Sequence, residues 1–123
     1  MIYLASPYSS LNGPDRERRY QQTCRAVVHL MRNGCVVFSP IVHSHPLAQY
    51  GLPYEWTYWE HVDRAYLKRC DEVVVLKLDG WIFSRGVQTE IQIAKELGKP
   101  IGYLSMDAVT VAPLAPQTTE VPP

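Results

Sequence analysis

Four short apolar runs alternate along the chain with longer segments of helical periodicity. Pro7 and Pro40 end the first two runs, because proline lacks the backbone N–H that a strand needs. The third run is the most continuous, which is typical of a central strand covered on both faces. The pattern therefore predicts four strands, at Ile2–Ser6, Cys35–Ser39, Glu72–Leu78 and Pro100–Ser105.

Three segments between these runs have the spacing of helices. The first is Pro14–Asn33, in which one stripe is formed by Tyr20, Cys24, Val27, Val28 and Met31. The second runs from about Glu55 to Arg69, and the third from Gly86 or Val87 to Gly98. The stretch 41–53 has no clean period, so we expect a long loop there.

Strands that alternate with helices indicate parallel pairing through right-handed crossovers. We expect an α/β, three-layer, flavodoxin-like sheet of four to five strands with helices on both faces. Residues 1–105 form this domain, and 106–123, with four of the ten prolines and no Lys or Arg, form an extended or disordered tail. A site is expected at the carboxyl ends of the strands, where Ser6 ends the first run and Tyr8 follows it.

Charge and composition narrow the possible partners. The chain of 123 residues has twelve basic and twelve acidic side chains, so it lacks the basic surplus that holds a nucleic acid polymer or an anionic membrane. No run approaches the roughly 18 apolar residues of a membrane span. Three cysteines without a CxxC pair indicate reduced core residues rather than disulfides or a zinc site. We expect a cytoplasmic protein.

Glu90 is an unusual residue of the third predicted helix. It lies on the apolar face formed by Val87, Ile91 and Ala94, where an unpaired charge is costly. Interaction with the helix dipole is the simpler explanation, but the residues three and four positions away offer neither a capping box nor an ion pair. We interpret Glu90 as a functional carboxylate.

Asp63 repeats this pattern in the second helix. It sits on the apolar face, with Trp59 and Tyr66 one turn away and no basic residue at the neighbouring helical positions. A structural role, accepting hydrogen bonds from a loop, is the alternative. Two inward carboxylates beside one crevice suggest acid–base or nucleophilic chemistry.

An anion site is predicted at the start of the third helix. Ser84 and Gly86 precede that helix, so a hydroxyl, backbone N–H groups and the helix dipole converge on a phosphate or carboxylate. Arg16, in the first turn of the first helix and on its inward face, is expected to contribute, although a surface ion pair would also explain it.

His43 and His45 lie in the predicted loop. In an extended segment alternate side chains share a face, so the two imidazoles would be placed to chelate a metal, with His61 as a distant third. We prefer a role in lining the substrate pocket and expect no metal and no organic cofactor.

Two segments and one aspartate carry a resemblance to a known group of enzymes. They are Tyr3–Tyr8 (YLASPY), Ser84–Ile91 (SRGVQTEI) with Ala94, and Asp63, eight residues before Asp71. Over residues 1–105 the chain resembles the nucleoside 2-deoxyribosyltransferase-like superfamily, and more narrowly a small uncharacterised branch of it.

The resemblance implies roles for three residues. The glutamate matching Glu90 attacks the anomeric carbon, the aspartate matching Asp63 handles the base, and the tyrosine matching Tyr3 orients the glutamate. Six residues before the glutamate, the transferases have aspartate and the nucleoside 5′-monophosphate hydrolases have serine. Ser84 therefore favours the hydrolases.

The expected function is cleavage or transfer of the N-glycosidic bond of a small (deoxy)nucleoside 5′-monophosphate. Three alternatives stay open: a transferase acting on unphosphorylated nucleosides, a non-catalytic nucleotide-binding module, favoured by Gln92 where relatives have glycine, and a metal-dependent hydrolase. Three Trp and eight Tyr exceed what a four-stranded sheet readily covers, so we also expect a homo-oligomer.

Overall fold

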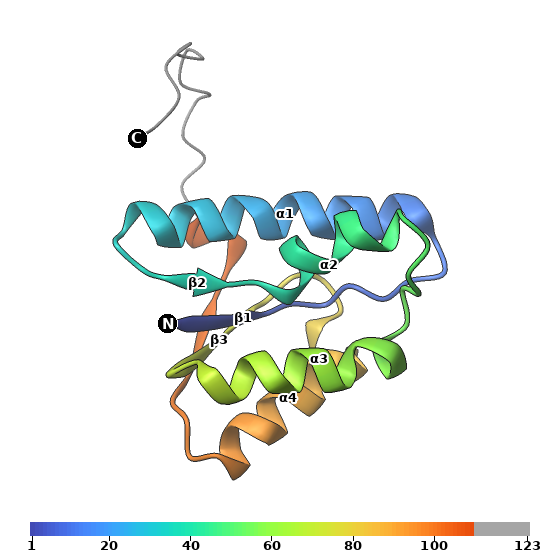
Figure 1. Cartoon of the computed structure of the whole chain (residues 1–123). Coiled ribbons are helices and arrows are strands. Elements are labelled where there is room, and N and C mark those ends of the chain that lie inside the picture. Colours follow the sequence, from blue (N-terminus) through green and yellow to red (C-terminus); the bar gives the residue numbers. More distant parts are fainter. Residues whose placement is uncertain (110–123) are drawn as a thin grey trace, which may run out of the picture.

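The computed structural model describes residues 1–109 and has four strands and four α-helices (Figure 1). Short 3₁₀ turns, labelled η, follow β3 and β4. In chain order the elements are β1 (Ile2–Ala5), α1 (Gly13–Arg32), β2 (Val37–Phe38), α2 (Pro40–Ala48), α3 (Trp56–Arg69), β3 (Glu72–Leu76), η1 (Trp81–Phe83), α4 (Arg85–Glu96), β4 (Ile101–Leu104) and η2 (Met106–Ala108).

The four strands form one parallel sheet in the order β2-β1-β3-β4. The central pair is in register from Ile2 opposite Glu72 to Ala5 opposite Val75. The chain moves outward from β1 in one direction to β2 and in the other to β3 and β4, so β1 and β3 flank the switch point at which α/β folds bind ligands. The predicted α/β sheet is confirmed, with four strands.

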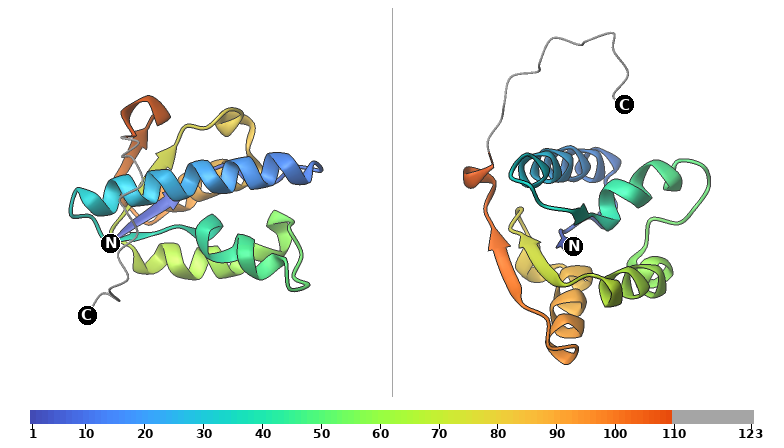
Figure 2. Two further views of the ribbon diagram at one scale, coloured as in Figure 1. Left: turned by 90° about the horizontal axis from the view of Figure 1, so that it is seen from above. Right: turned by 60° about the vertical axis from the view of Figure 1, so that its left-hand side comes forward.

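The two faces of the sheet are covered by different helices, which gives the three layers (Figure 2). Tyr3 and Ala5 of β1 pack with α3 and α4, whereas Leu4 packs with Ala26 of α1. Strand β3 alternates in the same way, because successive side chains of a strand point to opposite faces. The predicted helices on both faces are therefore present.

Helix α1 turns only part of its predicted stripe inward, since Val27 packs against the core. Its buried residues are Thr23 and Ala26, while Val28 and Met31 are exposed. The prediction followed the largest apolar side chains, but the close packing of a long helix on a sheet favours small residues such as Ala26 at the contact. The helix ends where predicted, since Gly34 adopts the left-handed conformation (φ +86°).

The predicted loop 41–53 is wrong over its first half, which forms α2. Ser39 caps this helix by accepting a hydrogen bond from the Val42 N–H at 3.1 Å, and Pro40 occupies the first turn, where it needs no N–H partner. A capped start and a fixed proline φ outweigh the weak periodicity of the segment. Pro46 lies inside the helix but within its first two turns.

The boundary of the predicted tail also differs. Met106–Ala108 form the turn η2, and Met106 and Val109 pack against the α1-side core, so these residues belong to the folded domain. The rest of the predicted tail, 110–123, lies outside the described residues. The three cysteines are free thiols, and none of the helices within residues 1–109 has the length and apolar character needed to cross a membrane.

Candidate active site

A cavity of about 570 Å³ lies beside the carboxyl ends of β1 and β3, at the switch point of the sheet. Its walls come from the residues after β1, from α1 and α2, from the start of α3 with the preceding loop, and from the start of α4. Six of the ten residues predicted for the site line it: Ser6, Tyr8, Asp63, Ser84, Gly86 and Glu90.

Glu90 forms the most buried acidic part of the cavity wall. Only 3% of the residue is exposed, and its Oε2 atom has no hydrogen-bond partner within residues 1–109. Burial raises the pKa of Glu90 well above its usual value; the Tyr3 hydroxyl opposes the rise and the Asp63 carboxylate adds to it. The sequence prediction that Glu90 faces inward is confirmed.

Tyr3 lies behind Glu90 in the central strand β1. The side chain is fully buried, and its hydroxyl makes no hydrogen bond of normal geometry with the described residues. Burial, followed by the charges of Glu90 and Asp63, holds the pKa of Tyr3 well above its usual value, so the hydroxyl keeps its proton. A protonated hydroxyl next to a carboxylate is placed to donate to it and to fix its orientation.

Asp63 lines the same cavity from α3. It is 7% exposed, as predicted for a carboxylate on the inward face, and burial raises its pKa from 3.8 to about 7. An acid with this pKa exchanges its proton near neutral pH, which is the range in which a general acid or base works best. Asp63 and Glu90 thus bring two titratable groups of unusual pKa into one cavity.

All three buried polar atoms that lack a partner in the described part of the chain belong to this region. They are Tyr3 Oη, Glu90 Oε2 and Trp56 Nε1. Trp56 lies against the first turn of α4, where a Cβ at Gly86 would come within 3.2 Å of the indole ring. Unsatisfied groups are costly in a core, so their concentration here is typical of a functional site rather than of a packed interior.

The first turn of α4 supplies the anion-binding features. Ser84 caps the helix by accepting a hydrogen bond from the Val87 N–H at 3.3 Å, and its own hydroxyl proton is not used in that bond. Arg85 lines the cavity beside it. The helix dipole, the free N–H groups and the guanidinium together favour a negatively charged ligand.

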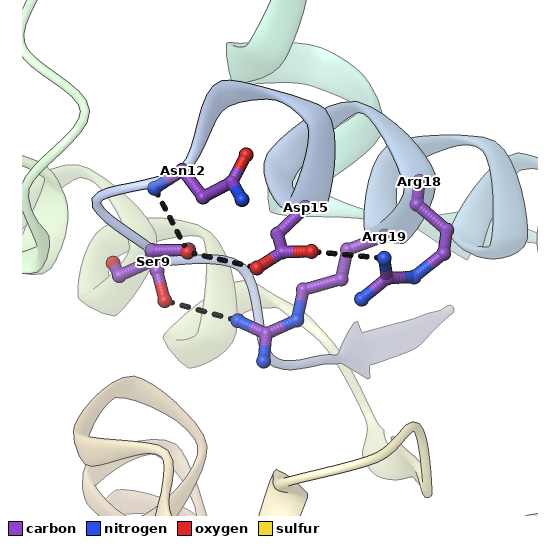
Figure 3. Close-up of polar contacts among 6 residues, drawn as sticks. Ser9, Asn12, Asp15, Arg18 and Arg19 are labelled. Atoms are coloured by element: carbon purple, nitrogen blue, oxygen red, sulfur yellow. Dashed lines mark hydrogen bonds and ion pairs between the residues drawn. The ribbon is translucent and has the colours of Figure 1, made fainter.

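A second guanidinium, that of Arg19 on α1, lines the cavity; Figure 3 shows its hydrogen bond to Ser9. Arg19 donates a hydrogen bond to the Ser9 carbonyl at 2.9 Å, and both residues line the cavity. Arg18 points elsewhere and pairs with Asp15 at 2.8 Å. Arg19 thus provides, together with Arg85, the positive charge of the cavity wall.

Arg16, the residue predicted to bind the anion, is not part of the cavity lining. Its guanidinium donates to the Ser10 carbonyl and lies 4.3 Å from the ring centre of Tyr54, which does line the cavity. The inward helical face was the reason for choosing Arg16, but the loop that precedes α1 folds back over this turn and engages the side chain.

The two histidines do not line the cavity, and they do not share a face. In the helix α2 residues two positions apart point in different directions, so the reasoning from an extended segment does not apply. His43 is exposed and packs edge-on against Tyr66, with 5.9 Å between ring centres, whereas His45 is buried behind Tyr8. Within residues 1–109 no three His, Cys, Asp or Glu side chains are grouped as metal ligands.

Arg19 and Ser44 line the cavity but escaped the sequence analysis. Arg19 precedes the buried Thr23 by one turn, so it belongs to the true inward stripe of α1. The fully buried residues of that stripe, Thr23 and Ala26, are small, and its larger members Val27 and Leu30 lie further along the helix, so the stripe gives a weak hydrophobic signal near Arg19. Ser44 lies in a segment whose apolar pattern predicts a loop, and only the pair Ser39-Pro40 indicates the helix start that places Ser44 in the cavity wall.

Comparisons with known proteins give a family and no activity. Among curated proteins, no sequence matches this chain. Residues 1–106 match the family described as "Domain of unknown function (DUF1937)", and this span includes every strand and α-helix of the structure. The chain therefore belongs to the DUF1937 family.

Proposed function

We propose that this protein cleaves or transfers the N-glycosidic bond of a small (deoxy)nucleoside 5′-monophosphate, with Glu90 as the nucleophile. The observation that carries the proposal is the buried Glu90 carboxyl in the cavity wall, with one oxygen unpartnered and Tyr3 and Asp63 close enough to shift its pKa. The resemblance of Tyr3–Tyr8 and Ser84–Ile91 to the nucleoside 2-deoxyribosyltransferase-like superfamily supports the same assignment.

In the first step a Glu90 carboxylate oxygen attacks the anomeric carbon and forms a glycosyl ester. The bond to the base nitrogen breaks, its electron pair leaves with the base, and Asp63 donates a proton to the base. In the second step Asp63 accepts a proton from water, whose oxygen attacks the same carbon. The ester bond breaks and Glu90 regains its charge, so two inversions retain the configuration.

Burial raises the pKa of both Asp63 and Glu90, and the mechanism needs the pair that carries a single proton, held on Asp63 while Glu90 is ionised. Below the titration range both groups are protonated and no nucleophile exists; above it both are ionised and no acid is present. A bell-shaped dependence of kcat/KM on pH follows. Tyr3, which keeps its proton, favours the ionised state of Glu90.

The phosphate is assigned to the start of α4. Ser84, Arg85 and Arg19 line one cavity that also contains Glu90, and its volume lies in the range of roughly 300–1,000 Å³ typical of small-molecule sites. Two guanidinium groups and a helix N-terminus favour a dianion over a neutral sugar. No metal and no organic cofactor takes part in this route.

The test is incubation of the protein with nucleosides and their 5′-monophosphates, followed by detection of free base. Release from monophosphates supports the proposal. Release from nucleosides alone would favour the transferase alternative, and binding without release would favour the non-catalytic module. A fluorinated slow substrate should leave a glycosyl adduct on Glu90 that mass spectrometry locates.

We also propose that the protein is a homo-oligomer. Large apolar side chains are exposed near α2 and α3, including Tyr50 (89%), Leu52 and Tyr58. Surfaces of this kind commonly mark contacts between subunits. Light scattering at micromolar concentration should give a mass above that of the 14.0 kDa chain; a monomer would contradict the proposal.

A further inference from the structure

A chain of two hydrogen bonds leads from the cavity wall to the protein surface. The Tyr8 hydroxyl lies 2.6 Å from Nδ1 of His45, and Nε2 of His45 lies 2.7 Å from a carboxylate oxygen of Glu17. Tyr8 lines the cavity, the His45 side chain is buried, and about half of the Glu17 side chain is exposed. Each residue comes from a different element: the segment after β1, α2 and α1.

The direction of these bonds follows from the three groups. Hydrogen bonds from Gln21 and then from His45 lower the pKa of Glu17, so its carboxylate accepts and Nε2 of His45 donates. Burial raises the pKa of Tyr8 to about 12, against the opposing charge of Arg16, so the phenol keeps its proton. In the neutral imidazole Nδ1 is then the acceptor for that proton.

Aromatic packing fixes this arrangement. The Tyr20 ring stacks on His45 at 4.3 Å with an interplanar angle of 24°, and the Tyr8 ring meets His45 edge-on at 5.5 Å. Tyr54, also a lining residue, stacks beside Tyr8 at 6.5 Å. The imidazole can neither flip nor withdraw without losing contacts to Tyr8 and to α1, the helix that lies beside α2 (Figure 1).

We propose that Glu17 and His45 are positioning residues that hold Tyr8 as a hydrogen-bond acceptor for an O–H or N–H group of the bound nucleotide. The phenol proton is committed to His45, and Arg16 approaches the Tyr8 oxygen as a donor, which leaves one lone pair of that oxygen for a ligand in the cavity. A site built in this way discriminates against an analogue that lacks the donor, since a buried acceptor is then left unpaired. This inference rests on the proposed function for the identity of the ligand.

The test combines two variants in a double-mutant cycle. Tyr8→Phe removes the acceptor and should raise KM and the Kd of 2′-deoxynucleoside 5′-monophosphates about tenfold, with a smaller change in kcat. Glu17→Ala, on an exposed helix surface, should weaken binding by a few fold. The double variant should bind no more weakly than Tyr8→Phe alone, because Glu17 acts only through Tyr8.

Two matched variants serve as controls. Tyr103→Phe removes an exposed phenol of β4, and Glu60→Ala removes a partly exposed helical glutamate that pairs with Arg64 away from the cavity, so neither should change binding. An unchanged Kd in Tyr8→Phe, or additive losses in the double variant, would overturn the inference. If the network is purely structural, Tyr8→Phe, Glu17→Ala and the double variant should each lower the Tm and leave the KM unchanged.

Binding is read separately from turnover through the fluorescence of Trp56 and Trp59, which line the cavity. If the protein binds the monophosphates without releasing base, the proposed function fails while the cycle still tests Tyr8 through Kd. If no monophosphate binds, both fail. The donor is located by comparing 2′-deoxy with 2′,3′-dideoxy monophosphates, and adenine with hypoxanthine bases: Tyr8→Phe should abolish the preference for whichever group it contacts.

Discussion

The two faces of the sheet differ in the polarity of the side chains that they bury. On the α1 face the buried cluster of Leu4, Ala26 and Leu76 is apolar, and the buried Thr23 of α1 has its hydroxyl satisfied by the Arg19 carbonyl at 2.7 Å. On the α3/α4 face the core includes Tyr3 and adjoins Asp63 and Glu90, and it leaves polar atoms without partners. Burial of such groups costs stability, so the first face stabilises the fold, while the second carries a cost that the proposed catalytic role would explain.

Replacing Glu90 by Gln should separate activity from stability on the α3/α4 face. Without the nucleophile, kcat/KM for base release should fall at least about a thousandfold. The Tm should hold or rise, because a buried acid is replaced by a neutral group of the same shape. Activity assays and thermal unfolding of one preparation measure both quantities.

Glu96→Gln is the matched control, since this glutamate lies on the exposed side of the same helix. It should change neither activity nor Tm. Near-normal turnover in Glu90→Gln would contradict the proposed mechanism. A large loss of Tm would show that folding of the α3/α4 face depends on the Glu90 carboxyl.

Asp63 should make stability depend on pH. Its folded pKa of about 7 lies above the ordinary value of 3.8, so the folded state binds the proton more tightly than the unfolded chain. The contribution of Asp63 to the free energy of unfolding is therefore highest below pH 4. It falls as pH rises towards 7, by on the order of 4 kcal/mol.

Denaturant unfolding from pH 4 to pH 8 measures this slope. Asp63→Asn should remove the contribution of Asp63, while Asp107→Asn, an exposed aspartate of η2, should leave the slope unchanged. If Asp63→Asn retains the full slope, Asp63 does not carry the buried proton.

Leu4→Ala tests the opposite face. Removing a fully buried side chain from the apolar cluster should lower the free energy of unfolding by about 3 kcal/mol. Tyr3→Phe, one residue away in β1, should be neutral or stabilising, because it removes an unpartnered hydroxyl. The kcat of Tyr3→Phe should fall, while the kcat of Leu4→Ala, measured well below the Tm of that variant, should stay near normal. The opposite result would show that the two faces do not differ in this way.

The sequence predicted those parts of the molecule that depend on local pattern. The four strands follow from short apolar runs, and the inward positions of Asp63 and Glu90 follow from helical spacing, since a charge on an apolar stripe is conspicuous. Local pattern could not predict long-range packing: the hydrogen bonds from Tyr8 to His45 and from His45 to Glu17 join residues that are 37 and 28 positions apart. The helix α2 was missed because its start is set by capping rather than by periodicity.

Ser84→Asp should change ligand preference at the edge of the α3/α4 face. Aspartate caps a helix as well as serine does, so the fold should persist while a negative charge is added. At an effective dielectric near 20, like charges about 4 Å apart cost roughly 4 kcal/mol, enough to reduce the preference for monophosphates over nucleosides about a hundredfold after screening. Ser84→Asn, an uncharged cap, should keep most of the preference. If Ser84→Asp leaves the ratio of monophosphate to nucleoside turnover unchanged, the phosphate does not bind at Ser84.

The smallest effect concerns α1, the helix of the apolar face that also sends a side chain to the cavity. Arg19→Ala should raise KM for monophosphates by about tenfold or less and leave KM for nucleosides unchanged, because a partly solvated charge pair contributes about 1 kcal/mol. Arg16→Ala is the matched comparison, since Arg16 lies three residues earlier on α1 and engages Ser10, Tyr54 and Tyr8 rather than lining the cavity itself. We expect a weaker effect from it on monophosphate KM, and the sequence-based assignment predicts the reverse order. Steady-state kinetics of the two variants decide between them: a larger loss in Arg16→Ala would mean that the loop before α1 rearranges when the nucleotide binds.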